Sequence, residues 1–329
     1  MSDVTALLFT IGEPYAARAV ESVRRQTLAV AEIVVIGPSE SPFHRAFNVG
    51  TRKVCTDFFL QLDADLILDS DCVALLRACA RDEVGVVTGR LRDPLLGRIG
   101  AVRLFRTACF ERDAFPDSIS PDTDFAAAIA AAGWRRLDAL ARRAGPPDLW
   151  HTFGAHRPDY TPLYTFAKFR LDGGRYRYRR DSHTLRDLVA RLRRSTHGAA
   201  PLALIALLHG VFHRDTSDQL RPYAADAEGA LAERFLSANG APPARLPDPQ
   251  AADLRDVFGR FLAHGAELSA RTDVATVHAA IDHLAADAPA SAASLVALLA
   301  LCHGLFQPLT GTDLNRDFAL LEGWLVTAP

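Results

Sequence analysis

An apolar pentapeptide that stops at acidic residues constrains this chain most: FFLQL at 58–62 runs directly into Asp63-Ala64-Asp65. A short apolar run of this kind suits a buried strand of a parallel sheet, and open α/β sheets bind ligands at the carboxyl ends of such strands. Asp63 and Asp65 are two residues apart, so on an extended backbone they project to the same side. Together they can hold a hard divalent cation that also binds a diphosphate. The same D-x-D pattern recurs at 69–71 and 122–124 without a preceding strand, where a solvated turn is the simpler interpretation.

The first half of the chain alternates between strand and helix patterns. Strands are expected at 6–11, 33–36, 58–62 and 84–88, and helices at 16–23, 43–54, 71–80 and 122–132. Gly133 is well placed as the C-cap of the last of these helices. Alternation of strand and helix implies right-handed crossovers and a mainly parallel, Rossmann-like sheet.

The pattern changes after about residue 184, where strand signals disappear and Ala and Leu dominate. This predicts an α/β domain over 1–184 and an all-α accessory domain over 185–329. Within the second region, LIALLHGVFH at 204–213 and LLALCHGLFQ at 298–307 are identical at six of ten positions. Two similar helices therefore recur, although one matched pair does not establish a repeat array. His209 and His303 lie on the apolar faces of these helices and are interpreted as core or helix-end histidines.

Composition argues against a nucleic-acid binder, a disulfide-bonded protein and a membrane-spanning protein. The net charge of −2 argues against a nucleic-acid binder. Five cysteines form no C-x-x-C pair and lie in apolar or helical contexts, which favours free thiols in a reducing compartment. The chain shows no basic-then-apolar leader, and the apolar stretches at 201–213 and 292–306 are too short to span a bilayer. The expected location is the cytoplasm, at most peripheral to the inner face of the membrane.

Five segments in order carry a resemblance to a known family. They are TALLFTIGEP at 5–14 with ESVRRQT at 21–27, FHRAFNVG at 43–50, the D-x-D strand, Leu104-Phe105-Arg106 with Phe110 and Phe115, and PDTDF at 121–125 followed by Gly133-Trp134. In this order and spacing, residues 5 to about 180 resemble an inverting family-2 glycosyltransferase with the GT-A fold. The Q-x-x-R-W signature of processive synthases is absent, which favours transfer of a single sugar.

The resemblance implies a role for each matching residue. Asp63 would contact the donor ribose or the metal, and Asp65 would ligate the metal. The other donor-binding positions would be Thr10, Glu13 and Asn48. Asp122 falls on the position of the general base, which takes a proton from the acceptor while the cation stabilises the leaving nucleoside diphosphate. The simpler alternative is that Asp122 only caps its helix.

The chain also departs from the family pattern. Val35-Ile36-Gly37-Pro38-Ser39 carries no carboxylate where the family has an Asp that recognises the nucleotide base, and Glu13 or Glu40 could substitute. A histidine after the catalytic helix often completes the metal site, and the chain offers His151 and His156. His156 is preferred because its H-x-P-x-Y segment resembles the closing loop of the family. A neutral imidazole suits Mn²⁺ better than Mg²⁺.

A basic and aromatic stretch follows, with ten Lys or Arg and three Asp over 168–194. If residues 175–180 are extended, the arginines 175, 177 and 179 share one face and could close over a diphosphate. A solvated interdomain strand is an equal alternative.

The expected function is therefore metal-dependent, inverting transfer of one sugar from a nucleotide-sugar donor to a glycan, lipid-linked, peptide or small-molecule acceptor, with Mn²⁺ or Mg²⁺. Two alternatives remain. A sugar-nucleotide nucleotidyltransferase would carry a glycine-rich basic loop after the first strand, and Gly12-Glu13-Pro14 is a poor match. A non-catalytic scaffold would use the helical region to bind a partner. That region could also mediate homo-oligomerisation.

Overall fold

The computed structural model describes residues 2–111, 113–139, 152–212, 231, 253–271 and 274–326. Its contacts divide the chain into two compact units, with the division between Pro158 and Asp159. Each unit is described by itself. No helix within these described ranges is both long and apolar enough to cross a membrane.

The first unit is an α/β structure. Its elements are β1 (Val4–Phe9), α1 (Ala16–Arg24), β2 (Glu32–Ile36), the 3-10 helix η1 (Pro38–Glu40), α2 (Phe43–Thr51), β3 (Phe58–Asp63), β4 (Leu66–Leu68), α3 (Cys72–Cys79), β5 (Val84–Asp93), β6 (Gly97–Arg106), the 3-10 helix η2 (Thr107–Phe110), α4 (Pro121–Ala131), β7 (Arg135–Asp138) and β8 (Gly154–His156). The second unit is helical. Its elements are α5 (Pro162–Tyr178), α6 (Ser182–Arg194), α7 (Ala200–Gly210), α9 (Leu254–Arg271), α10 (Val274–Asp287), α11 (Ala292–Thr310) and α12 (Leu314–Val326).

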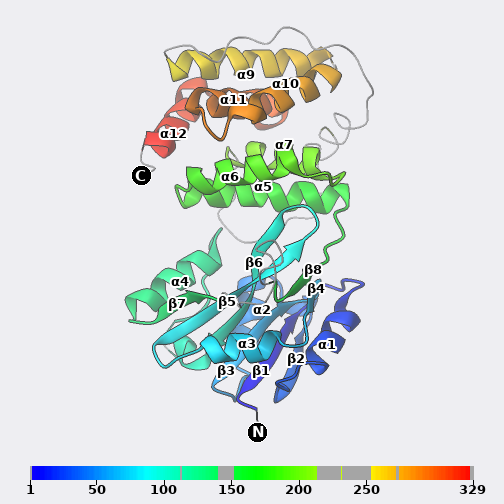
Figure 1. Cartoon of the computed structure of the whole chain (residues 1–329). Helices are drawn as coiled ribbons and strands as arrows, with labels where there is room; N and C mark the ends of the chain where they lie inside the picture. The colour runs from blue at the N-terminus through cyan, green and yellow to red at the C-terminus, as the bar shows by residue number, and fades with distance from the viewer. Residues whose placement is uncertain are drawn as a thin grey trace. The chain divides into compact units, whose positions relative to one another are not determined.

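The strands form one sheet in the order β2-β1-β3-β6-β5-β8-β4, with β7 paired to β5 (Figure 1). The strands β2, β1 and β3 are parallel, as the strand and helix alternation predicts. β6 is antiparallel to both of its neighbours, so the sheet is mixed. The predicted fold class, an α/β sheet followed by helices, is confirmed.

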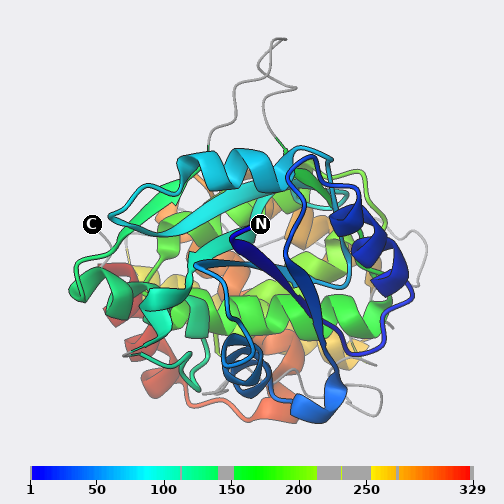
Figure 2. The ribbon, with the colours of Figure 1, turned by 90° about the horizontal axis from the view of Figure 1, so that it is seen from below.

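Alternation along the central strands fills both faces of the sheet. In β1, Ala6 and Leu8 join a cluster with α1 and α3, whereas Leu7 and Phe9 join a cluster with α2 and α4. Figure 2 shows α3 and α2 on opposite sides of the strands. Because successive side chains point to opposite faces, a strand covered on both sides has to be apolar throughout. All six residues of β1 are buried, and five of them are apolar; the hydroxyl of the sixth, Thr5, is hydrogen-bonded to the Thr56 hydroxyl at 2.8 Å.

The basic and aromatic stretch is helical, which corrects the expectation of an extended segment at 175–180. It belongs to α5, where Asp172 pairs with Lys168 at 2.9 Å and with Arg175 at 3.3 Å. These partners are four and three residues away, the spacings that bring side chains together on a helix. α5 packs on α7, so the contacts place it in the helical unit, which begins at Asp159. The sequence instead predicts the domain boundary at residue 184.

The recurrence within the helical unit covers more than one helix. Among the described residues, α5, α6 and α7 form one group of helices and α9, α10 and α11 another, and the most extensive helix contacts are α5 on α7 and α9 on α11. Both pairs touch through glycines: a Cβ on Gly210 would collide with the backbone of Arg170, and one on Gly304 with the carbonyl oxygen of Leu262.

The two halves meet through reciprocal aromatic contacts. His209 of α7 stacks on Phe306 of α11 with ring centroids 4.2 Å apart, and His303 of α11 stacks on Phe212, just after α7, at 4.1 Å. Both histidines are buried, at 1% and 3% exposure, as the sequence predicts. An exchange of equivalent contacts is what an approximate twofold axis produces. The structure therefore supports an internal duplication.

Candidate functional site

The end of β3 places Asp63 beside the end of β1. Asp63 is the residue opposite Phe9, and the amide of Ala64 donates to the Phe9 carbonyl at 3.0 Å. Burial, and then the nearby carboxylate of Asp65, raises the pKa of Asp63 to about 6. A cation bound here would relieve the cost of the two neighbouring negative charges.

Asp65 faces the histidine that the sequence favours. β4 pairs with β8, and this pairing sets His156 opposite Leu66, the residue after Asp65. His156 Nε2 lies 3.1 Å from Asp65 Oδ2, and His156 Nδ1 lies 2.5 Å from Asp93 Oδ2. Burial favours the neutral ring, but the hydrogen bonds with Asp65 and Asp93 outweigh it and raise the pKa of His156 to about 9.

The site fits a divalent cation in its donor atoms. Asp65 Oδ1 is a buried carboxylate oxygen without a hydrogen-bond partner, and such an atom is costly unless something else binds it. Oxygen donors beside an imidazole nitrogen suit Mn²⁺. Among the described residues, no group of three or more His, Cys, Asp or Glu side chains forms a metal cage.

Thr10 and Glu13 form a closed turn after β1. Glu13 Oε2 accepts from Thr10 Oγ1 at 2.6 Å and from the Ile11 amide at 2.8 Å, and Thr10 Oγ1 accepts from the Gly12 amide. Gly12 has a φ of 102°, which favours glycine. The turn follows the strand that pairs with β3, so it is held at the same edge of the sheet as Asp63.

Asp122 lies in the first turn of α4, whose N-cap is Ser120. Its carboxylate therefore does not serve as the N-cap. Arg103 Nη2 donates to Asp122 Oδ2 at 3.0 Å, and Arg103 Nη1 lies 3.4 Å from Gln61 Oε1 in β3. Arg103 thus ties the start of α4 to the strand that ends at Asp63. The helix ends at Ala131 with Ala132 as its C-cap, one residue before the predicted Gly133, which follows at a φ of 93°.

Asn48 has a structural contact that the sequence did not predict. Its Nδ2 donates to the Phe115 carbonyl and its Oδ1 accepts from the Phe115 amide, both at 2.8 Å. This pair of bonds holds the segment that leads to α4. A donor contact by Asn48 remains a prediction.

The structure brings Asp65 and His156 into contact, and it places Asp63 and the turn of Thr10 and Glu13 on paired strands. His151, the alternative histidine, lies outside the described residues. Glu40 lies 3.8 Å from Arg45. The sequence analysis missed Asp93 and Arg103, which bond to His156 and Asp122. No sequence motif marked either residue: Arg103 lies on β6, which pairs with the D-x-D strand, and Asp93 ends β5, which pairs with β6.

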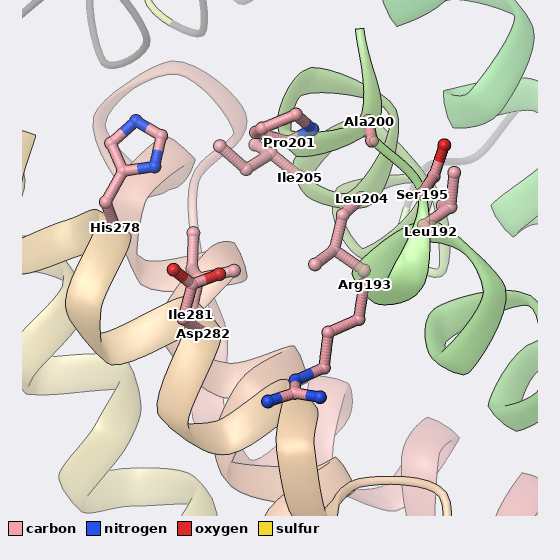
Figure 3. A pocket seen from close by; sticks show the side chains of 10 residues that line it. All are labelled: Leu192, Arg193, Ser195, Ala200, Pro201, Leu204, Ile205, His278, Ile281 and Asp282. Carbon is pink, nitrogen blue, oxygen red and sulfur yellow. The ribbon is translucent and has the colours of Figure 1, made fainter. Parts of the chain in front are cut away.

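A separate hollow of about 210 Å³ lies within the helical unit (Figure 3). Its wall comes from α6, α7 and α10, with Leu204 and Ile281 among the apolar residues and Arg193, His278 and Asp282 among the polar ones. Arg193 and Asp282 are exposed. None of the site residues predicted from sequence lines this hollow.

Comparisons with known proteins give no family assignment. No protein-family model matches the chain, and no curated protein matches it. Among solved structures, it is similar to the mannosyltransferase PcManGT from Pyrobaculum calidifontis in complex with GDP-Man and Mn²⁺. The identity is 16% and the TM-score 0.42, over 94% of this chain and 88% of that one.

Two further solved structures are similar to the chain. S. aureus TarS 1-349 in complex with UDP-GlcNAc is 12% identical with a TM-score of 0.36, over 95% of this chain and 93% of that one. The bifunctional IspDF from Campylobacter jejuni is 13% identical with a TM-score of 0.31, over 46% of this chain and 52% of that one. Identities and TM-scores this low assign no activity to the chain.

Proposed function

We propose that the chain is a metal-dependent, inverting glycosyltransferase that moves one sugar from a nucleoside-diphosphate sugar to an acceptor. One observation carries the proposal. Asp65, two residues after β3, lies 3.1 Å from His156, and Arg103, whose guanidinium is 3.4 Å from Gln61 of β3, donates to the carboxylate of Asp122. A cation-binding group and a partly exposed carboxylate in one site are the two elements that displacement of a diphosphate requires.

Asp65 and His156 would hold the cation, with Asp63 contacting the cation or the donor ribose. When bound, the cation stabilises the negative charge of the departing diphosphate. Asp122 accepts the proton of the acceptor nucleophile as its oxygen or nitrogen bonds to the anomeric carbon. The bond from that carbon to the diphosphate breaks, its electron pair leaves with the nucleoside diphosphate, and attack from the opposite face inverts the carbon.

Asp122 has the exposure that this role needs. Its side chain is 34% exposed and that of Arg103 is 21% exposed, so an acceptor can reach the carboxylate while Arg103 holds it. A general base must come within hydrogen-bonding distance of the proton that it removes. The turn of Thr10 and Glu13 would face the donor, and the helical unit would contribute acceptor recognition or self-association.

Calorimetric titration of the full chain with UDP, GDP, CDP and dTDP, each with and without Mn²⁺, tests the donor site. We expect one nucleotide to bind in a Mn²⁺-dependent manner, and Asp65→Ala to lose that dependence. Asp82→Asn, at an exposed position, is the matched acidic control. If no nucleotide binds in a Mn²⁺-dependent manner, the proposal fails and a scaffold role is favoured.

Product analysis then separates the two enzyme classes. With the matching nucleotide sugar, a glycosyltransferase releases the nucleoside diphosphate, slowly to water or faster to an acceptor. A nucleotidyltransferase instead forms pyrophosphate from a nucleoside triphosphate and a sugar phosphate. Pyrophosphate formation without release of nucleoside diphosphate would overturn the proposed reaction.

A further inference from the structure

We propose that Asp93 is a positioning residue that makes His156 a metal ligand, by holding the ring proton on Nδ1 so that Nε2 keeps its lone pair for a cation. This inference rests on the proposed function, because it requires a cation at Asp65. Nothing in the sequence motifs points to Asp93, which precedes Pro94 in a segment that reads as a turn.

Asp93 is fixed from two sides. Its Oδ1 accepts from the backbone amides of Leu95 at 2.8 Å and Leu96 at 2.6 Å, in the turn between β5 and β6. Its Oδ2 is 2.5 Å from His156 Nδ1, and its side chain is 0% exposed. A carboxylate without solvent contact needs hydrogen bonds to its oxygens, and the contacts with Leu95, Leu96 and His156 supply them on both oxygens.

The opposite ring nitrogen faces the candidate cation site. His156 Nε2 lies 3.1 Å from Asp65 Oδ2, and Asp65 Oδ1 is the buried oxygen without a partner. A neutral imidazole carries one proton, on one of its two nitrogens, and the hydrogen bond at one nitrogen decides the state of the other. Carboxylates can only accept, and His156 lies between two of them, so a cation bound at Asp65 displaces the proton at Nε2 while Asp93 retains the proton at Nδ1. Ligating histidines in metal sites commonly have such a carboxylate partner.

A purely structural role for Asp93 predicts a different outcome on substitution. Tying the turn requires only an oxygen that accepts from Leu95 and Leu96, and Asn supplies one. In Asp93→Asn the remaining group toward His156 is an amide NH₂, which donates. It would require an unprotonated Nδ1 and so place the proton on Nε2, where it blocks coordination. Asp93→Asn therefore keeps the turn at Leu95 and Leu96 but removes His156 Nε2 as a ligand of the cation.

The test uses the full chain and MnCl₂ alone. The free-Mn²⁺ electron paramagnetic resonance signal is titrated against wild type, Asp93→Asn and His156→Ala. We expect Asp93→Asn to weaken Mn²⁺ binding at least tenfold, as typical for loss of such a partner. The ¹⁴N coupling of bound Mn²⁺, measured by electron spin echo modulation, should be present in wild type and lost in both variants.

Asp317→Asn is the matched control. Asp317 in α12 is a buried carboxylate 3.1 Å from His303 Nε2, so the chain offers a second buried Asp–His pair, in the helical unit. Its substitution should leave Mn²⁺ affinity and the ¹⁴N coupling unchanged. A comparable loss in Asp317→Asn would mean that the effect is general destabilisation, and would overturn the inference.

The outcomes separate this inference from the proposed function. If wild type and Asp93→Asn bind Mn²⁺ equally and with the same ¹⁴N coupling, Asp93 has no positioning role and the metal site stands. If wild type binds no Mn²⁺, the positioning role of Asp93 and the proposed metal-dependent function are both overturned. Should Asp93→Asn not fold, long-range ¹H–¹⁵N spectra of wild type with diamagnetic Zn²⁺ decide the question. A proton on Nδ1 of His156 supports the inference, and a proton on Nε2 overturns it.

Discussion

The guanidinium of Arg103 donates to Asp122 Oδ2 at 3.0 Å. Arg103 comes from β6, where it is the residue paired with Gln61 of β3, and Asp122 comes from the first turn of α4. One side chain therefore joins the proposed base to the strand that ends at the proposed cation site. Arg103 also acts on Asp63, because its positive charge opposes the increase in the pKa of that carboxyl.

Arg103→Met should lower kcat roughly tenfold or more while KM for the donor changes less, because an ion-paired hydrogen bond to the base is lost. Arg103→Lys should retain part of the rate. Steady-state kinetics of donor hydrolysis give both constants. Arg90→Met, at an exposed position of β5, is the control and should change neither constant. A wild-type kcat in Arg103→Met would show that Asp122 does not depend on Arg103.

Asp122→Asn should bind the donor normally and turn over roughly a hundredfold or more slowly, as for removal of a general base. Asp124→Asn is the matched variant. Asp124 accepts from Ser118 Oγ at 2.5 Å, so its carboxylate is engaged within the loop that precedes α4. If Asp124→Asn had the larger loss of turnover, the acidic motif would be shifted by two residues from the register inferred here.

The sequence predicted the elements whose residue patterns are local, within a few neighbouring residues. Apolar runs and the D-x-D end located β1 and β3, and Gly133 located the end of α4. β6 was missed because its sequence, GRIGAVRLFR, is interrupted by glycine and arginine and only its second half is buried. Its stability comes from pairing with β5 and β3, which no local pattern reports.

Long-range contacts also explain which site residues were missed. Asp93 and His156 are 63 residues apart, and only the pairing of β5 with β8 brings them together. The basic stretch in α5 was interpreted through its arginines, which alternate over 175–179. The helical spacing of Phe166, Phe169 and Gly173 was the stronger signal, because all three are buried.

Asp63 makes the metal-free protein sensitive to pH. Its pKa of about 6 lies above the ordinary value of 3.8, so the protonated form is favoured by folding. The associated stability is complete below pH 3.8 and is lost as the pH rises through about 6, at most about 3 kcal/mol in all. Asp63→Asn should lack this loss. Urea unfolding at pH 4.5 and pH 7, without metal, measures the difference.

The control for this pH effect is Asp82→Asn at its exposed position, which should keep the pH dependence of wild type. Mn²⁺ should stabilise wild type more at pH 7 than at pH 4.5, because the ionised carboxylate binds the cation. Equal pH dependence in wild type and Asp63→Asn would contradict the assigned environment of Asp63.

Gly304→Ala should destabilise the helical unit by about 2 kcal/mol or more. A Cβ at Gly304 would collide with the Leu262 carbonyl oxygen, so α9 and α11 would have to separate. Gly323→Ala in α12 is the matched control, since a Cβ there meets open space and alanine favours helix by up to about 1 kcal/mol. Thermal unfolding of both variants tests the close approach. Equal melting temperatures would show that the helices are not in contact at Gly304.

Ending the chain at Pro158 should give a first unit that still binds Mn²⁺. All the residues of the proposed site, from Thr10 to His156, precede that point, and the contacts divide the chain there. Ending the chain at residue 184 should give a less soluble protein, because it keeps α5 without α7. Phe166 and Phe169 of α5, buried in the intact chain, would then be exposed.

Solubility and Mn²⁺ binding of the two shortened chains are the measurements, with transfer to acceptor as a separate readout. We expect the chain ending at Pro158 to hydrolyse donor and to transfer poorly, since acceptor recognition is proposed for the helical unit. Full transfer by that chain would make the helical unit unnecessary for catalysis. Better folding of the chain ending at 184 would instead place α5 with the sheet, as the sequence alone suggests.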